Sequence, residues 1–327
     1  MTPPRPGKVQ GISRREDVML TVTVPDEDLL GRLADLSDRV RLVLWDLDRP
    51  LPAAVAAQVD VVVIPHYVVD LSRFVLLRAL PRLHIVQLPS AGFEHAVPNV
   101  PLGVTVCNGR GVHSAGTAEL AVGLLIAMQR GLPDAVRAQD AGRWENPALP
   151  AVADRRVLLL GTGSVGEAVA ARLAPFEVDL VRVGRTARDT PSGRVHGVAE
   201  LADLLPQADV VVITLPGGAG THHLLDAAAL ALLPDGALLV NVGRGTVVDT
   251  DALIAELTAG RLRAALDVTD PEPLPADHPL WHTPNTLVTA HQGGHSDATG
   301  PRVAALVRHQ LEALLAGHEP INVVART

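Results

Sequence analysis

The feature that most constrains the fold of this chain is a glycine pattern directly after an apolar run. The segment 157–160 reads VLLL, and GTGSVG follows it from Gly161 to Gly166. After the turn, Val165, Val169 and Leu173 recur at helical spacing. A buried strand that passes through G-x-G-x-x-G into a helix is typical of a dinucleotide-binding βαβ unit. We therefore predict that this turn binds the pyrophosphate of a dinucleotide.

Each glycine of the turn has a predicted task. Gly161 permits the tight turn, Gly163 lets the backbone approach the pyrophosphate, and Gly166 brings the helix close to the sheet. The first helical residues, Ser164 and Val165, then offer free N–H groups to the anion. The alternative is a glycine-rich turn without a ligand.

Strand-like and helix-like segments alternate along the chain, which indicates an α/β fold with parallel sheets. Five strands are expected in the first half, at residues 18–24, 41–45, 59–64, 83–88 and 104–107. Six are expected in the second half, at 157–160, 178–183, 209–214, 237–242, 263–268 and 286–289. The predicted fold is two doubly wound parallel-sheet domains, a flavodoxin-like substrate domain and a Rossmann cofactor domain, with a cleft between them.

Two helices suggest how the domains are connected. Residues 117–130 are apolar nearly all round, so that helix must be buried between domains or against another subunit. A terminal helix at 301–316 is expected to pack back on the first domain. We predict a disordered tail at 1–17, a substrate (catalytic) domain at 18–115 plus 295–327, and a dinucleotide-binding Rossmann domain at 116–294.

Composition excludes several classes of partner. The net charge is −8 and the arginines are dispersed, so the basic stripe that nucleic acid requires is missing. No apolar run reaches the roughly 18 residues that span a bilayer, so we expect no membrane partner. The chain has one cysteine, which suits a reducing compartment. We expect a cytoplasmic protein that acts on a small molecule.

The end of the second Rossmann strand bears on the choice of cofactor. NAD enzymes usually place a carboxylate there for the ribose 2′-OH. Here the strand runs into Gly184, Arg185 and Thr186, with Arg188 shortly after. Guanidinium groups suit a 2′-phosphate, so we predict that NADP(H) is preferred and that NAD(H) is possible. The alternative is that these arginines lie in a solvated loop.

Three chemically matched residues follow successive strands of the second half. Arg244 lies between two glycines, Glu272 between two prolines, and His291 after the last strand. Reduction of a 2-keto acid needs a cation for the carboxylate, a proton donor, and a carboxylate that keeps the donor protonated. We predict that Arg244, Glu272 and His291 fill these roles, and we expect no metal ion.

The order of these motifs resembles the D-isomer-specific 2-hydroxyacid dehydrogenases. The turn after Val183 is most similar to NADPH-using glyoxylate/hydroxypyruvate reductases, and Glu272 is unlike the Gln of formate dehydrogenases. The resemblance implies that Arg244 binds substrate and that Glu272 with His291 is the acid/base pair. It implies further cofactor contacts at Thr117, Leu215, Pro216, Thr221, Val242 and Asp267. Family members are commonly homodimers.

The substrate is expected to contact the first domain. The resemblance implies that backbone N–H groups of Ser90, Ala91 and Gly92 hold its carboxylate. His66 and Tyr67, after the third strand, either bond a polar substituent or line the pocket.

Some positions depart from the family pattern, and alternative functions stay open. Ala290 stands where the family usually has Pro, Glu177 where it prefers Gly, and Gln292 is also atypical. The first two alternatives are phosphite and a bulkier keto acid as substrate. The third is a non-catalytic NAD(P)(H)-sensing regulatory protein on the same fold.

Overall fold

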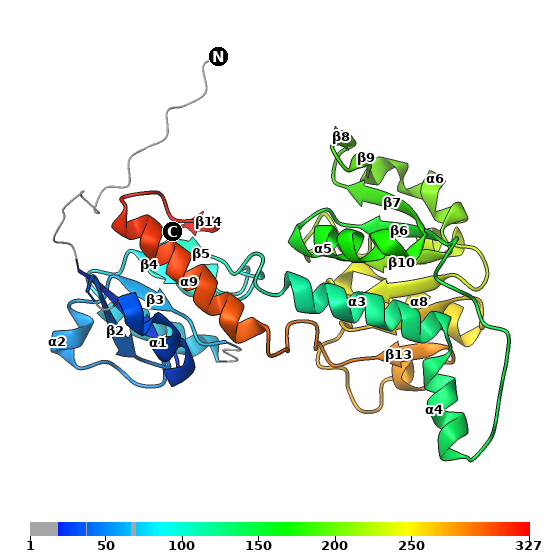
Figure 1. Cartoon of the computed structure of the whole chain (residues 1–327), viewed down its shortest axis with the longest axis horizontal. Coiled ribbons are helices and arrows are strands. Elements are labelled where there is room, and N and C mark those ends of the chain that lie inside the picture. Colours follow the sequence, from blue (N-terminus) through cyan, green and yellow to red (C-terminus); the bar gives the residue numbers. More distant parts are fainter. Residues whose placement is uncertain (1–18, 37, 67–69) are drawn as a thin grey trace. The chain divides into compact units, whose positions relative to one another are not determined.

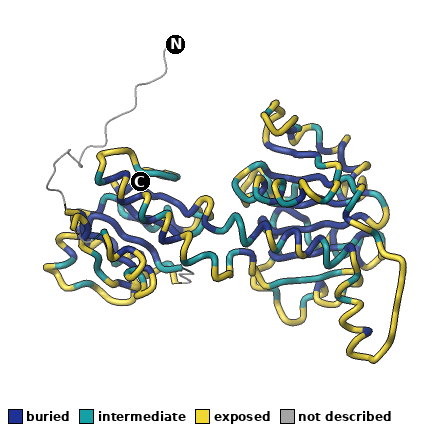
Figure 2. Tube along the Cα trace, in the orientation of Figure 1, coloured by how far each residue is buried: buried dark blue, intermediate teal, exposed yellow. Residues whose placement is uncertain are grey.

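The chain forms two compact α/β units in the computed structural model, which describes residues 19–36, 38–66 and 70–327. One unit contains the described residues up to His113 together with Asp297–Thr327, and the other is Ser114–Ser296 (Figure 1). The tail predicted at residues 1–17 lies outside the described residues. In both units the central strands are buried, and most of the exposed residues lie in loops, helix surfaces and edge strands (Figure 2).

The first unit is built on a six-stranded sheet in the order β14-β5-β4-β3-β1-β2. Its strands are β1 (Leu20–Val24), β2 (Val40–Leu44), β3 (Val61–Val63), β4 (Ile85–Gln87), β5 (Thr105–Cys107) and β14 (Val323–Arg326). The five predicted strands are parallel and follow the flavodoxin-like order. The sixth strand, β14, was not predicted; it pairs antiparallel with β5 at the edge.

Helices cover this sheet, and one of them comes from the end of the chain. They are α1 (Glu27–Leu33), α2 (Ala53–Ala56), α9 (Thr299–Leu315) and the 3-10 helices η1 (Ala34–Leu36), η2 (Leu71–Ala79) and η3 (Val97–Asn99). Buried leucines and valines of α1 and α9 share one apolar core with β1 and β3. Arg308 of α9 also pairs with Asp35 of η1 at 2.7 Å. The unit is thus assembled from two separate chain segments.

The second unit is built on an eight-stranded sheet in the order β13-β12-β11-β10-β6-β7-β9-β8. Its strands are β6 (Arg156–Leu160), β7 (Asp179–Gly184), β8 (Arg188–Thr190), β9 (Gly193–Gly197), β10 (Val210–Ile213), β11 (Leu238–Asn241), β12 (Arg263–Leu266) and β13 (Thr286–Val288). Across the sheet, the six strands β9-β7-β6-β10-β11-β12 have the Rossmann order, and β13 is added at the edge beside β12. The predicted count of six strands was therefore wrong. The two strands that were missed, β8 and β9, are polar segments with arginine and glycine and carry little hydrophobic signal.

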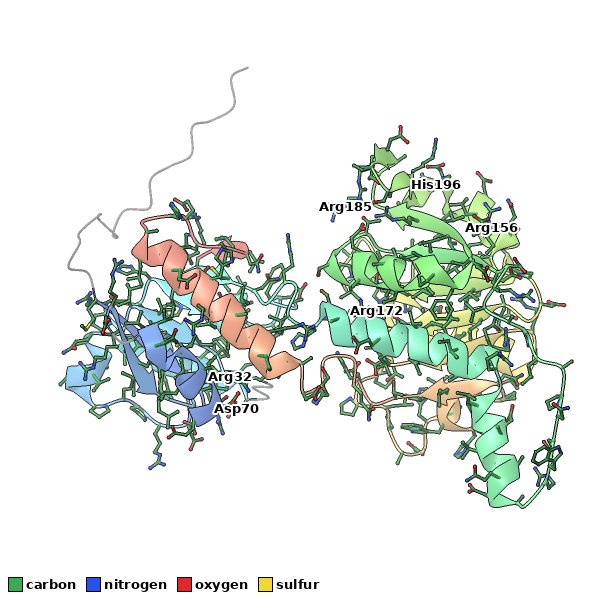
Figure 3. The ribbon with its side chains drawn as sticks, in the orientation of Figure 1. Arg32, Asp70, Arg156, Arg172, Arg185 and His196 are labelled. Atoms are coloured by element: carbon green, nitrogen blue, oxygen red, sulfur yellow. The ribbon has the colours of Figure 1, made fainter. Side chains whose placement is uncertain are left out.

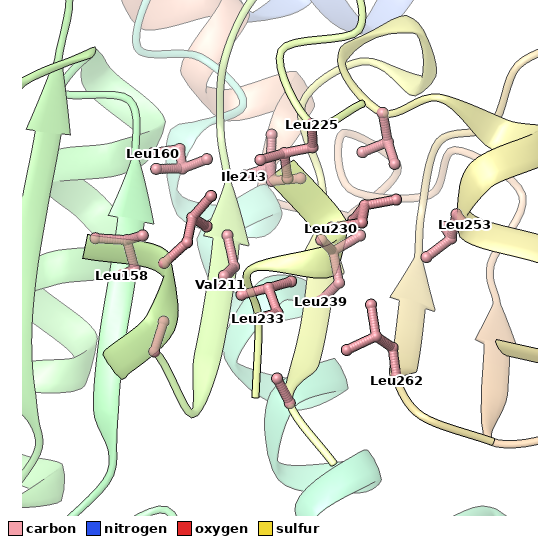
Figure 4. Packing of buried hydrophobic residues seen from close by; sticks show 14 of the residues in the cluster. Leu158, Leu160, Val211, Ile213, Leu225, Leu230, Leu233, Leu239, Leu253 and Leu262 are labelled. Atoms are coloured by element: carbon pink, nitrogen blue, oxygen red, sulfur yellow. The ribbon is translucent and has the colours of Figure 1, made fainter. Parts of the chain in front are cut away.

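Two apolar cores lie on the opposite faces of this sheet. Because side chains alternate along a strand, Leu158 and Leu160 of β6 enter one core (Figure 4), while Val157 and Leu159 enter the other. The helices are α3 (Ser114–Gln129), α4 (Leu132–Asp140), α5 (Ser164–Leu173), α6 (Leu201–Leu204), α7 (Ala227–Ala231) and α8 (Thr250–Thr258). Short 3-10 turns complete the unit: η4 (Ala174–Phe176), η5 (Val198–Glu200), η6 (Leu205–Gln207), η7 (Gly245–Val247) and η8 (Pro279–His282).

Helix α3, expected from its apolar sequence to be buried, is covered on one face within its own unit. Ala118, Ala121 and Leu125 are almost fully buried against the sheet. Leu120 and Ile126 are only partly buried. Within the described part of the chain, no helix is long and apolar enough to cross a bilayer.

Candidate active site

The glycine turn connects β6 to α5, as the motif predicted. Gly161 has φ +112°, which a residue with a side chain rarely adopts. A Cβ on Gly166 would lie 2.0 Å from the Gly161 carbonyl oxygen, so only glycine lets the helix start this close to the strand. A Cβ on Gly163 would meet nothing within 4 Å. The turn therefore fits a pyrophosphate, because the backbone is open to an approaching anion at the start of α5.

Two arginines flank the turn at the end of β7. Arg185 is exposed directly after Gly184 (Figure 3), and Arg188 begins β8. Arg188 Nη2 donates to Thr162 Oγ1 at 2.8 Å, which ties it to the glycine turn. Sequence reasoning had missed Thr162 as a partner, since nothing in the pattern marks the variable positions of the motif. One hydrogen bond thus joins Arg188 to the glycine turn, and Arg185 lies three residues before Arg188 in the chain.

The other predicted cofactor positions follow β10 and β11. Thr221 Oγ1 donates to the Pro216 carbonyl at 2.7 Å, so this hydroxyl holds the loop after β10. A Cβ on Gly243 would lie 2.5 Å from the Leu215 carbonyl oxygen, which shows how closely the two loops approach. Val242 is buried beside them, 6% exposed. These residues lie at the carboxyl edge of the sheet, where ligands bind in open α/β folds.

His291 and Glu272 form a hydrogen-bonded pair in this unit. His291 Nδ1 contacts Glu272 Oε1, and both side chains keep part of their surface exposed. Because Nδ1 is engaged, Nε2 is the ring nitrogen left to meet a substrate. Two loops that follow different strands therefore join a proton donor to a carboxylate.

The pair favours the charged forms of both groups. The Glu272 hydrogen bond raises the pKa of His291 and outweighs the opposing effects of burial and of the Arg244 charge. Burial acts to raise the pKa of Glu272, but the His291 bond and charge prevail and hold it below its ordinary value. An imidazolium beside a carboxylate is the state required of a general acid.

Arg244 lies beside the loop that carries Glu272. A Cβ on Gly245 would fall 2.0 Å from the Thr269 carbonyl oxygen, so glycine is needed for the two loops to meet. Asn241 Nδ2 donates to the Arg244 carbonyl at 3.0 Å and holds the backbone of the turn. The Arg244 charge acts on both Glu272 and His291. The three predicted catalytic residues are thus brought together.

Asp267 organises the segment that presents His291. Its buried carboxylate accepts from Thr289 Oγ1 at 2.6 Å, from Gln292 N at 2.7 Å and from Gly293 N at 2.9 Å. His291 N donates to the Asp267 carbonyl at 2.8 Å. Since an ionised carboxylate has about four acceptor sites, these three bonds leave about one for a further donor.

These bonds bear on the positions that depart from the family pattern. His291 has φ +50°, an uncommon left-handed conformation. The preceding residue is Ala290 and not the usual proline of the family, and the bonds to Asp267 hold the segment in place. Thr117 packs against the same segment, because a Cβ on Gly293 would lie 3.2 Å from Thr117 Oγ1. Glu177 is likewise left-handed, with φ +58°, which accounts for the glycine preferred there.

Apart from Arg244, the predicted substrate residues that the structure describes belong to the first unit. Ser90, Ala91 and Gly92 follow β4 and form a tight loop, in which Ser90 Oγ donates to the Gly92 carbonyl at 2.8 Å. His66 Nε2 lies 3.1 Å from His113 Nε2. Tyr67 lies outside the described residues.

Comparison with known proteins identifies the family. Residues 122–293 match the model for "D-isomer specific 2-hydroxyacid dehydrogenase, NAD binding domain". A glyoxylate reductase of Thermofilum pendens is 32% identical over 260 residues, 76% of this chain and 77% of that protein. The human glyoxylate reductase/hydroxypyruvate reductase is 30% identical over 321 residues, 93% of this chain and 96% of that protein.

Solved structures agree with these relatives. A family protein from Aeromonas salmonicida has a TM-score of 0.82 at 26% identity, covering 94% of this chain and 100% of that one. An NADPH-dependent glyoxylate/hydroxypyruvate reductase from Sinorhizobium meliloti, in complex with NADP and malonate, has a TM-score of 0.73 at 29% identity, covering 94% and 97%. The predicted fold class and the resemblance drawn from the motifs are confirmed. The chain belongs to the D-isomer specific 2-hydroxyacid dehydrogenase family and is an NAD(P)-dependent hydroxyacid oxidoreductase.

Proposed function

We propose that this enzyme reduces a small 2-keto acid, such as glyoxylate or hydroxypyruvate, to the 2-hydroxy acid with NADP(H) as the preferred cofactor. The observation that carries the proposal is the His291–Glu272 pair, in which the hydrogen bond to the carboxylate raises the pKa of the imidazole. Support for the substrate class comes from relatives named as glyoxylate and hydroxypyruvate reductases. The retained acid/base pair argues against a purely sensing role.

Each residue has a defined part in this reaction. The nicotinamide, when bound, supplies the hydride to the keto carbon. His291 Nε2 delivers the proton to the carbonyl oxygen as the hydroxyl forms, and Glu272 stabilises the imidazolium before that transfer. Arg244 holds the carboxylate and polarises the carbonyl. In the reverse direction neutral His291 accepts the proton.

The functional test is absorbance at 340 nm with NADPH and NADH in parallel. Glyoxylate, hydroxypyruvate, pyruvate and phenylpyruvate are compared as substrates for reduction, and phosphite is tested for oxidation with NADP and NAD. Clear turnover of glyoxylate or hydroxypyruvate is expected. Turnover confined to phenylpyruvate or to phosphite would reassign the substrate. Tight cofactor binding without turnover of any compound would favour the sensing alternative.

The preference for NADP(H) is supported by the arginines at the end of β7. Replacing Arg185 with alanine is expected to raise the KM for NADPH about 10- to 100-fold, because a hydrogen bond to a charged group contributes roughly 1.5–3 kcal/mol. The KM for NADH should stay unchanged, since NADH has no 2′-phosphate. The measurement is the ratio of kcat/KM for the two cofactors.

A matched control for Arg185 is Arg194→Ala. Arg194 is an exposed arginine on β9, and it pairs with Glu200 at 3.1 Å. This variant should leave both cofactor KM values as they are. If Arg185→Ala weakens NADH and NADPH equally, the 2′-phosphate role of Arg185 is wrong.

We also infer that the enzyme is a homodimer. Apolar side chains are exposed on α4 and the segment after it: Leu132 is 48% exposed, Val136 57% and Trp144 98%. Large apolar side chains exposed in one short stretch of chain are typical of an interaction site, and twofold dimers are the commonest oligomers. Light scattering should give a mass of two chains, and Trp144→Ser should shift it toward one. A monomeric wild-type enzyme would contradict the inference.

A further inference from the structure

The loop after β4 turns its carbonyl groups inward. The Ser90 carbonyl accepts from Gly109 N at 2.6 Å, and the Ala91 carbonyl accepts from Asn108 Nδ2 at 2.7 Å. The Gly92 carbonyl accepts from Ser90 Oγ at 2.8 Å. All three carbonyls of the loop are therefore engaged by groups of their own unit.

Inward carbonyls fix the direction of the N–H groups. In a trans peptide the C=O of one residue and the N–H of the next point in opposite directions. The bonds to the Ser90 and Ala91 carbonyls therefore turn the N–H groups of Ala91 and Gly92 away from Asn108 and Gly109. Neither N–H donates to a protein acceptor in the described part of the chain, whereas Phe93 N donates to Glu94 Oε2 at 3.0 Å. Two adjacent N–H groups without a protein acceptor are suited to bind one anion.

Asn108 is itself held firmly. Its side chain is buried, 4% exposed. Gln87 Nε2 donates to the Asn108 carbonyl at 3.2 Å, and Asn108 N donates to the Asn322 carbonyl at 3.0 Å. A Cβ on the neighbouring Gly109 would lie 2.0 Å from the Pro89 carbonyl oxygen, so the segment after β5 packs directly against the start of the loop after β4. The amide of Asn108 is thus a rigid donor aimed at one carbonyl.

We propose that Asn108 is a positioning residue that orients the Gly92 N–H toward the substrate carboxylate. The proposal rests on the proposed function, since it takes the substrate to be a 2-keto acid. Asn108 does not touch the substrate. Its bond to the Ala91 carbonyl sets the peptide plane between Ala91 and Gly92.

The experiment replaces Asn108 with alanine and, separately, with aspartate. Aspartate keeps the shape and the acceptor for Arg110 N but cannot donate to the Ala91 carbonyl. Both variants should raise the KM for the keto acid about tenfold, the loss expected for one hydrogen bond to a charged group. The kcat should fall less than threefold, and the Kd for NADPH should not change.

Asn99→Ala is the matched control. Asn99 Nδ2 donates to the His95 carbonyl at 2.9 Å in the same unit, on an exposed turn. Its loss should leave the KM for the keto acid at the wild-type value. A KM unchanged in Asn108→Asp, or a rise matched in Asn99→Ala, would overturn the proposal.

A second readout separates this proposal from the function itself. Calorimetric binding of oxalate, a dicarboxylate probe, to the NADPH-loaded enzyme requires no turnover. Oxalate binding that weakens about tenfold in both Asn108 variants supports the loop assignment even if no keto acid is reduced. Unchanged oxalate affinity in a folded variant contradicts it. Wild-type turnover of glyoxylate or hydroxypyruvate tests the function separately.

Discussion

Replacing His291 with alanine is expected to lower kcat for keto acid reduction about 10²- to 10⁴-fold, the range typical of a lost general acid. The physical reason is that His291 alone in the catalytic set pairs with a carboxylate that raises its pKa. Without the imidazole, the developing alkoxide must take its proton from water. The Kd for NADPH, measured by fluorescence titration, should stay within about twofold, because the glycine turn is untouched.

The control for this variant is His282→Ala, which removes an exposed histidine of the same unit. It should retain wild-type kcat and Kd. A His291→Ala enzyme with wild-type kcat would show that another group donates the proton. A variant that loses NADPH binding as well would point to a structural role for the segment after β13.

The pH profile tests the partnership of His291 with Glu272. Because Glu272 raises the pKa of His291, the imidazolium persists to higher pH than in a free histidine. Glu272→Gln removes the negative charge, so the pKa of His291 should fall. As the pH is raised, the reduction rate of the variant should then begin to decline at a lower pH than that of the wild-type enzyme. The measured quantity is the alkaline limb of kcat/KM for the keto acid against pH. An unshifted limb would show that Glu272 does not control the titration of His291.

Long apolar runs made most of the fold predictable. The strands β6, β10 and β11 are buried Val- and Leu-rich segments, and the sequence places them directly. By contrast, β9 reads GRVHG and has Val195 as its one apolar side chain, so neither an alternating nor a continuous apolar pattern marks it in the sequence. The edge strand β14 is only half covered, which leaves a similarly weak signal.

The candidate site was easiest to predict where chemistry restricts the residue type. Arg244, Glu272 and His291 stand at strand ends and have few substitutes for the roles proposed for them, so spacing and order marked them as candidates. Bonds that depend on tertiary approach could not be foreseen. The link between Arg188 and Thr162 arises because β8 folds back along β9.

Replacing Arg244 with alanine is expected to reduce kcat/KM for the keto acid about 10²- to 10⁴-fold. A guanidinium can make two bonds to a carboxylate, each contributing roughly 1.5–3 kcal/mol, and tenfold corresponds to about 1.4 kcal/mol. Both parameters should suffer: KM rises because the carboxylate loses its cation, and kcat falls because the carbonyl is less polarised. Steady-state kinetics with NADPH held at saturation separates the two effects.

Arg244→Lys distinguishes geometry from charge. Lysine keeps the cation but presents a point charge in place of a planar fork, so it should recover only part of the loss. Full recovery would mean that charge alone suffices and that bidentate binding is not used. The sharpest contradiction would be an alanine variant with wild-type KM and reduced kcat. In that case Arg244 would act only on the developing charge, and the ground-state carboxylate would be held by other groups, with the N–H donors of Ala91 and Gly92 the first to test.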